Sequence, residues 1–401
     1  MVDYSRAEAA QRAGITAERL TELVEHGILQ PSDGDRFTSG DIRKATMVQS
    51  LMDAGLPLKG LAQVITSGMF PLDFMDSPTY ERFSALSDVT FAELSRRTGM
   101  PVELLMAIRE ATGGALPSPD DRLLETELDI VPFVETPFSA GWRQITLERM
   151  LRVQGENLRR IAETESDSWR SEVILPALAA GKTGNALANP ELAEKMAPTI
   201  EPALLAEYHA HQARSWTASI ISGFEAVMAQ AGYQSRVDRP PAMCFLDITG
   251  YTRLTDERGD EAAAALATQL SRIVQRSSFQ HGGKPVKWLG DGVMFWFRDP
   301  GPGVVAALDM ADSVVGAGLP PAHVGLHAGP VVFQQGDYYG QTVNIASRIA
   351  EYARPGEVLV SKAVVEASEQ SADDRLTYTD IGPVELKGVG VAVHLLSARR
   401  A

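Results

Sequence analysis

The 401-residue chain has 44% hydrophobic residues and a formal net charge of −15. This length predicts two or three domains with well-formed cores, and the negative charge argues against general binding to nucleic acid, which favours basic proteins. The single cysteine, Cys244, excludes an intrachain disulfide and indicates the cytoplasm. The N-terminus lacks the plan of a signal peptide, and no apolar run approaches the length of a membrane span.

Residues 1–72 have the pattern of a small helical domain. Helical segments are expected at 6–12 and 17–26, a small hairpin at 33–38, and another helix from Asp41. This order resembles the winged helix-turn-helix of MerR-type regulators. Residues 1–70 contain seven Lys and Arg against nine Asp and Glu. Because DNA readers usually carry a basic stripe, we expect a structural or regulatory use of this fold rather than DNA binding.

A weak internal repeat relates this domain to residues 91–111. Six residues of the first helix pair recur 85 positions later, as Ala92, Glu93, Arg97, Gly99, Glu103 and Leu105. A duplicated helix-turn-helix accounts for the repeat, and so does a generic pattern of two helices. Two copies are too few for a solenoid array.

Residues 73–235 are predicted to form a helical regulatory and dimerisation region. Apolar periodicity favours helices at 145–163, 166–180 and 202–231, and the last of these is expected to transmit regulation. Its apolar face is interpreted as core or as a dimer seam, and it consists of Leu205, Tyr208, Trp216, Ile220, Ile221, Phe224, Val227 and Met228. Segment 234–241 is the expected linker into a third domain, residues 236–401.

Two stretches of the third domain end on carboxylates. The apolar run 242–246 leads to Asp247, and the turn that follows opens a helix pattern whose free N–H groups suit a phosphate. Two β-rich runs flank Asp291, which predicts a hairpin with a second carboxylate at its tip. Either residue alone fits an ordinary turn aspartate. Two such carboxylates are what a pair of magnesium ions on a nucleoside triphosphate requires.

A third stretch, residues 336–348, turns from a glycine-flanked loop into a helix with Asn344 and Arg348 on one face. Together the three stretches resemble the class III nucleotide cyclases, whose patterns Phe-x-Asp-x-x-Gly, Lys-x-x-Gly-Asp and Asp-x-x-Gly-x-x-Val-Asn-x-Ala-Ser-Arg occur here in the family's order. The resemblance covers about residues 240–400. It implies an α+β fold, in which a ferredoxin-like cyclase domain, a mixed sheet with helices on one face, follows a mostly α-helical regulatory region containing the winged-helix-like unit.

The resemblance also assigns metal and base recognition. Asp247 and Asp291 match the family's metal-binding carboxylates, which implies two Mg²⁺ or Mn²⁺ ions per site. Lys287 and Asp337 match the pair that reads the purine. A lysine donates to adenine N1 and an aspartate accepts from the exocyclic amine, whereas guanine presents the opposite pattern. The pair therefore favours ATP as the substrate. The short strand-to-Asp337 connection is similar to that of the short-armed bacterial subgroup.

Other positions match residues that bind the sugar and phosphates. Asn344 resembles the residue that orients the ribose, and Arg348 resembles the cation that stabilises charge on the α-phosphate. Lys387 lies near the family's polyphosphate-binding lysine. The turn Ile248, Thr249 and Gly250 is expected to contact the substrate phosphates.

These features predict a soluble, cytoplasmic adenylate cyclase that makes cyclic AMP from ATP as a homodimer with its active sites at the dimer interface. Its layout is similar to that of soluble cyclases of actinobacteria, whose autoinhibitory modules respond to pH or bind fatty acids. Regulation by pH, a lipid or a small molecule is the corresponding expectation. Three alternatives stay open: a MerR-like transcription regulator with a nucleotide-sensing domain, a guanylate cyclase, and an inactive scaffold. The presence of all six matched site residues argues against the scaffold.

Overall fold

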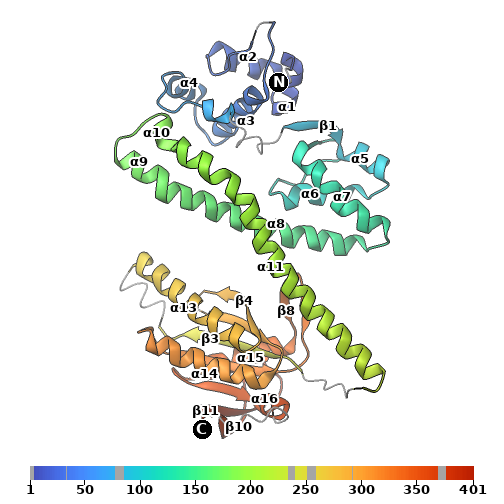
Figure 1. Cartoon of the computed structure of the whole chain (residues 1–401), viewed down its shortest axis with the longest axis vertical. Coiled ribbons are helices and arrows are strands. Elements are labelled where there is room, and N and C mark those ends of the chain that lie inside the picture. Colours follow the sequence, from blue (N-terminus) through green and yellow to red (C-terminus); the bar gives the residue numbers. More distant parts are fainter. Residues whose placement is uncertain are drawn as a thin grey trace. The chain divides into compact units, whose positions relative to one another are not determined.

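The computed structural model describes residues 4–32, 34–76, 85–233, 240–250, 259–290, 292–368 and 376–401 (Figure 1). The chain forms two compact units, Met1–Ser222 and Gly223–Ala401, whose boundary falls within helix α11 (Pro190–Gln230). The expected α+β class is confirmed, since helices dominate the first unit and a mixed sheet the second. Most of the expected linker, residues 234–239, lies outside the described part, and the domain bounds at 72 and 235 stay predictions.

The chain begins with four helices, α1 (Arg6–Ala13), α2 (Ala17–Glu25), α3 (Ser39–Asp53) and α4 (Leu58–Thr66), followed by the 3₁₀ turn η1 (Asp73–Asp76). The first three helices start where capping residues dictate, because the side chains of Ser5, Thr16 and Thr38 each accept a hydrogen bond from the backbone N–H three residues later. Where a hairpin was expected at 33–38, the described residues form two single bridges, Ser32–Arg36 and Tyr4–Phe37.

The next elements repeat this arrangement. They are β1 (Leu86–Thr90), α5 (Phe91–Thr98), α6 (Val102–Ala111), β2 (Arg122–Leu124) and α7 (Glu125–Ser139). Helix α5 starts and ends 85 residues after α1, and Gly14 and Gly99 end the two helices with φ of 70° and 72°. Strands β1 and β2 pair where the first copy has its Tyr4–Phe37 bridge. The structure therefore supports duplication over a generic pattern of two helices.

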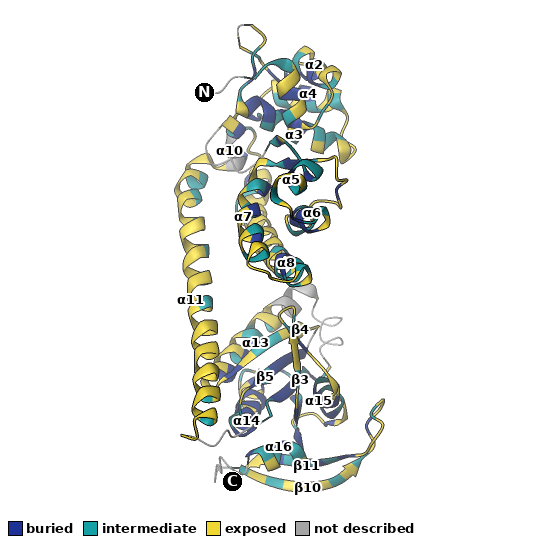
Figure 2. Cartoon of the chain, turned by 90° about the vertical axis from the view of Figure 1, so that its right-hand side faces the viewer, coloured by how far each residue is buried: buried dark blue, intermediate teal, exposed yellow. Residues whose placement is uncertain are grey.

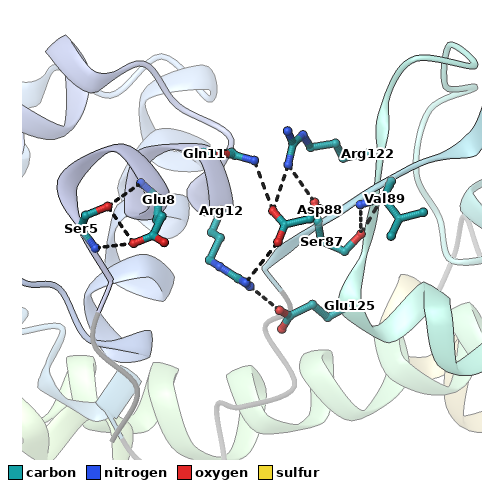
Figure 3. Close-up of polar contacts among 9 residues, drawn as sticks. All are labelled: Ser5, Glu8, Gln11, Arg12, Ser87, Asp88, Val89, Arg122 and Glu125. Atoms are coloured by element: carbon teal, nitrogen blue, oxygen red, sulfur yellow. Dashed lines mark hydrogen bonds and ion pairs between the residues drawn. The ribbon is translucent and has the colours of Figure 1, made fainter. Parts of the chain in front are cut away.

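A cluster of charged residues joins the two copies (Figure 3). Arg12 of α1 lies 2.5 Å from a carboxylate oxygen of Glu125 and 3.8 Å from one of Asp88. Arg122 approaches the same Asp88 carboxylate at 3.2 Å. Asp88 is 73% exposed, and exposed ion pairs contribute only about 0–1 kcal/mol each. The cluster thus orients the copies more than it stabilises them.

The long helices of the first unit differ from their predicted bounds. Instead of separate helices at 145–163 and 166–180, α8 (Gln144–Trp169) continues through a π-helical turn, η3 (Arg170–Ile174), into α9 (Leu175–Ala179). The hydroxyls of Thr164 and Ser168 donate to carbonyls one turn earlier, so they extend the helix instead of capping a new one. A short helix, α10 (Asn185–Ala188), precedes α11.

Helix α11 begins at Pro190 and not at the predicted Pro202. Asn189, with φ of 45°, precedes the first turn, and its side chain accepts from the N–H of Leu192. The predicted apolar face is exposed in the single chain, with values from 38% at Met228 to 67% at Phe224. The interpretation of this face as core is therefore wrong for the isolated chain, and the dimer seam stays a prediction. Among helices in the described ranges, none is both long and apolar enough to cross a membrane.

The second unit is built on a seven-stranded sheet with the order β10-β11-β9-β6-β3-β5-β4. Its strands are β3 (Ala242–Ile248), β4 (Gly283–Leu289), β5 (Gly292–Phe297), β6 (Ala322–Ala328), β9 (Val358–Ser361), β10 (Leu376–Val384) and β11 (Val393–Arg400). Only β6 and β9 run parallel among the described pairs. A separate hairpin consists of β7 (Val332–Gln334) and β8 (Asp337–Tyr339). Strand β11 was not predicted, although it joins β10 to the rest of the sheet.

Helices cover both faces of this sheet, so the expectation of helices on one face is wrong (Figure 2). Helices α13 (Asp260–Gln280), α14 (Pro300–Gly316) and α16 (Lys362–Ser368) pack on one face, against residues such as Cys244 and Leu246. Helix α15 (Gln341–Tyr352) packs on the other face, where Met243 and Phe245 point. Gly325 permits this close contact, because a Cβ there would lie 2.2 Å from the backbone nitrogen of Ala350.

A partly buried histidine, His327, makes the folded chain sensitive to acid. Nδ1 of His327 in β6 lies 2.7 Å from the hydroxyl oxygen of Ser361 in β9, and burial lowers the pKa of His327 from 6.5 to about 4. Between these values the unfolded state binds the additional proton, so the free energy of unfolding falls as pH decreases from 6.5 to 4. The loss is at most about 1.4 kcal/mol per pH unit. In denaturant titrations at pH 7.5 and pH 5, His327→Gln is expected to lose less stability than wild type; equal losses would contradict this origin.

Candidate active site

Asp247 lies near the end of β3, with His323 of β6 and Gly292 of β5 as its neighbours across the sheet. Nε2 of His323 lies 3.7 Å from a carboxylate oxygen of Asp247. The other ring nitrogen lies 2.8 Å from the carbonyl oxygen of Ala350 in α15. The Asp247 side chain is 43% exposed, so it stays accessible to a ligand. Asp291, the second predicted carboxylate, lies outside the described residues.

The surroundings of Asp247 fit a divalent cation. Carboxylate oxygens are the hard ligands that Mg²⁺ and Mn²⁺ prefer. The oxygen of Asp247 that faces Gly292 is buried, and a Cβ on this glycine would meet it at 3.4 Å, an ordinary van der Waals contact. Among the described residues, no group of three or more His, Cys, Asp and Glu side chains could hold a metal ion.

The turn after β3 offers fewer phosphate contacts than expected. Thr249 donates its backbone N–H to the carbonyl of Pro321 at 3.1 Å, so this amide is engaged within the fold. The buried hydroxyl of Thr249 meets no hydrogen-bond partner in the described part of the chain. It is therefore the group of this residue that fits a phosphate oxygen or a metal-bound water. Gly250 has φ of 72° and is exposed, whereas Ile248 is buried.

Lys287 of β4 and Asp337 of β8 form an ion pair, although 50 residues separate them in sequence. The Lys287 side chain is 41% exposed and that of Asp337 is 20% exposed. One oxygen of Asp337 accepts the backbone N–H of Tyr338 at 2.8 Å, and the other oxygen contacts Lys287. The structure thus places a cationic donor and an anionic acceptor side by side, which is the arrangement that an adenine edge needs.

Helix α15 presents the two predicted catalytic residues, Asn344 and Arg348, at its surface. Asn344 is exposed, and the Arg348 side chain is 39% exposed. The guanidinium of Arg348 donates to both carboxylate oxygens of Glu351 at 2.6 Å. Lys387 is exposed in the connection between β10 and β11. Of the predicted site residues that the structure describes, Lys287 and Asp337 are the two joined by an ion pair.

Two neighbours of the site were not identified from the sequence. Glu351 lies three residues after Arg348, and this helical spacing is a signal that sequence reasoning could have used. His323 offered no such signal, because its contact with Asp247 depends on the register between β3 and β6.

Comparison with protein families identifies both ends of the chain. Residues 320–398 match the model of the adenylate and guanylate cyclase catalytic domain. Residues 4–67 match the MerR HTH family of regulatory proteins. The chain therefore carries a nucleotide cyclase catalytic domain and a MerR-type domain, as the sequence motifs predicted. The cyclase match includes Asp337, Asn344, Arg348 and Lys387 and begins after Asp247 and Lys287.

Relatives along most of the chain include bacterial adenylate cyclases. A pH-sensitive adenylate cyclase of Mycobacterium tuberculosis is 28% identical over 326 residues, covering 78% of each chain. An adenylate cyclase of Streptomyces coelicolor is 27% identical over 283 residues, covering 70% of this chain and 72% of the relative. The crystal structure of an adenylyl cyclase from P. aeruginosa is 22% identical, covers 41% of this chain and 95% of its own, and gives a TM-score of 0.35. The sequence relatives confirm that the chain is an enzyme of the cyclase type.

Proposed function

We propose that this chain is an adenylate cyclase that converts ATP into 3′,5′-cyclic AMP and pyrophosphate. The observation that carries the choice of nucleotide is the ion pair between Lys287 and Asp337. Adenine offers an acceptor at N1 beside a donor at its amine, and the pair matches both groups. Relatives named adenylate cyclase support the same substrate. The lone cysteine, buried in β3, supports the cytoplasm as the compartment.

The remaining site residues have roles that follow from their chemistry. The ribose 3′-hydroxyl attacks the α-phosphorus, and pyrophosphate leaves. Negative charge grows on the phosphoryl oxygens, and Arg348, which exchanges Glu351 for the nucleotide, stabilises it with a permanent planar charge. Asn344 orients the ribose for attack, and Lys387 contacts the leaving polyphosphate.

Asp247 and Asp291 are the residues that would hold two divalent cations. When bound, Mg²⁺ or Mn²⁺ lowers the pKa of the attacking hydroxyl and neutralises the polyphosphate. The half-exposed carboxylate of Asp247 at the end of β3 supports this assignment.

Activity of the purified full chain tests the proposal. With ATP and Mg²⁺ or Mn²⁺, cyclic AMP and pyrophosphate are expected in equal amounts, and Asp247→Asn is expected to reduce both products together. Asp312→Asn, which changes an exposed carboxylate on α14, serves as the matched control. Hydrolysis of ATP to ADP without a cyclic product would refute the function.

The proposed enzyme is regulated by its N-terminal region through α11. The last two turns of α11 belong to the catalytic unit, within which Glu225 forms an ion pair with Arg298. Deletion of residues 1–235 is expected to change activity several-fold, most simply upward if the region is autoinhibitory. Rates of residues 236–401, residues 223–401 and the full chain are to be compared across pH and with added lipid. Identical rates under all conditions would exclude autoinhibition.

The MerR-type domain is proposed to serve regulation and not DNA binding. The second helix of a helix-turn-helix enters the major groove, and here that helix, α2, exposes Glu18, Glu22 and Glu25. Its Arg19 is paired with Glu22. Carboxylates on this face repel phosphates, so a mobility-shift assay is expected to show no binding.

A further inference from the structure

Three aromatic rings surround the ammonium group of Lys284, an exposed residue near Lys287 and Asp337; we call them the cage. The ammonium nitrogen of Lys284 lies 5.5 Å from the ring centroid of Trp296, 5.4 Å from that of Phe333 and 5.5 Å from that of Tyr338. Trp296 and Tyr338 stack with an interplanar angle of 10° and centroids 5.9 Å apart. A cation within about 6 Å of a ring centroid is attracted by the ring's negative face. Lys284 of β4 therefore contacts one ring of the adjacent strand β5 and two rings of the β7–β8 hairpin.

A β-bulge places this cage on the same face of the sheet as Lys287. Lys284 lies opposite Trp296, and Lys287 lies opposite Met294, with an irregular register between Pro285 and Lys287. Without the extra residue, side chains three positions apart would point to opposite faces. The bulge thus aligns Lys284 and Lys287 toward the side that carries β8.

The hairpin that carries Asp337 depends on side-chain contacts for its position. In the described part of the chain, β7 and β8 form their own two-stranded sheet, separate from the seven-stranded one. Tyr338 anchors the hairpin, since the residue is only 8% exposed and contacts both Lys284 and Trp296. Its backbone N–H donates to Asp337, which in turn contacts Lys287. The cage is therefore linked to the base-reading carboxylate through a single residue.

We propose that Lys284 is a positioning residue for base selection, acting through the Trp296, Phe333 and Tyr338 cage to hold Asp337 against Lys287. This inference rests on the proposed adenylate cyclase function. It assigns Lys284 no contact with the nucleotide. Lys284 affects the hydrogen bond between Asp337 and the purine amine. If the β7–β8 hairpin is loose, the Asp337 carboxylate is not held in position to accept that bond.

The experiment compares ATP with purine riboside 5′-triphosphate, which keeps N1 but lacks the amine, in the full chain. Lys284→Met is expected to reduce the preference for ATP, measured as the ratio of kcat/KM values, by roughly 3- to 30-fold, the range of a lost cation–π interaction. Lys284→Arg keeps the cation and is expected to retain most of the preference. Lys362→Met, which removes a 61% exposed lysine on α16, is the matched control and is expected to change nothing.

A second variant keeps the test decisive if Lys284→Met fails to fold. Phe333 is 58% exposed, so Phe333→Leu removes one wall of the cage at little risk to folding, and a smaller loss of preference is expected. Equal decreases for both nucleotides, with the ratio unchanged in Lys284→Met or in Phe333→Leu, would overturn the inference. Failure of the wild-type chain to make cyclic AMP would instead overturn the proposed function before any variant is compared.

Discussion

Asp247→Ala and Arg348→Ala are each expected to reduce cyclic AMP synthesis by roughly 10²- to 10³-fold, and an equimolar mixture of the two is expected to recover about a quarter of wild-type activity. In the proposed homodimer, each site takes its metal carboxylates from one chain and its base and transition-state residues from the other. A mixed dimer therefore collects both defects in one site and leaves the second site intact. Random pairing makes about half of the dimers mixed, and half of the sites in those are active.

The positions of Arg348 and Asp247 support this division. Arg348 is turned outward and pairs with Glu351 at the surface of α15. Asp247 lies at the end of β3 beside His323. Arg354→Ala, at an exposed arginine beyond the end of α15, is the matched control and should retain full activity. Absence of recovery, under conditions where subunits demonstrably exchange, would show that each site is built within one chain.

The double variant Lys287→Glu with Asp337→Cys is expected to lower kcat/KM for ATP by on the order of 10²-fold or more, because a site built for hydrogen bonds strongly rejects a mismatched base. The new side chains reverse the donor at N1 and remove the acceptor for the amine, so turnover of GTP is expected to increase relative to ATP. Each single variant leaves one charge of the ion pair without its partner. The double variant is therefore the cleaner measurement.

A control variant and a contradicting outcome complete this test of base selection. Lys362→Glu makes the same charge reversal as Lys287→Glu, at an exposed position on α16, and should leave nucleotide preference unchanged. An unaltered preference for ATP in the double variant would mean that Lys287 and Asp337 do not read the base.

Local signals carried much of the prediction. Strand β3, the β4–β5 hairpin and helix α15 are each marked by a run of apolar residues and a glycine turn, so their existence follows from nearby residues alone. The same holds for the capped helices of the first domain. The family resemblance predicts that Lys287 and Asp337 act as a pair, and in the structure the two side chains form an ion pair.

Features that depend on contacts between residues far apart in the chain were not predicted from the sequence. Strand β11 is recognised by its pairing with β9 and β10, not by its own pattern. The placement of α15 on the second face depends on Gly325, which lies in another strand. The Lys284 cage needs a bulge to bring residues three apart onto one face, and period-two alternation cannot show this. Helix α8 extends beyond its predicted end at residue 163. Thr164 and Ser168 are residue types that suit a helix cap, but here their hydroxyls donate to carbonyls of the preceding turn.

The most direct measurement of the central claim is a competition in which the purified full chain receives equal concentrations of ATP and GTP with Mg²⁺ or Mn²⁺, and both cyclic products are quantified by mass spectrometry. If the Lys287–Asp337 pair selects adenine, cyclic AMP will dominate the products by at least about tenfold. Cyclic GMP in equal or greater amount would contradict the assignment of ATP as the substrate.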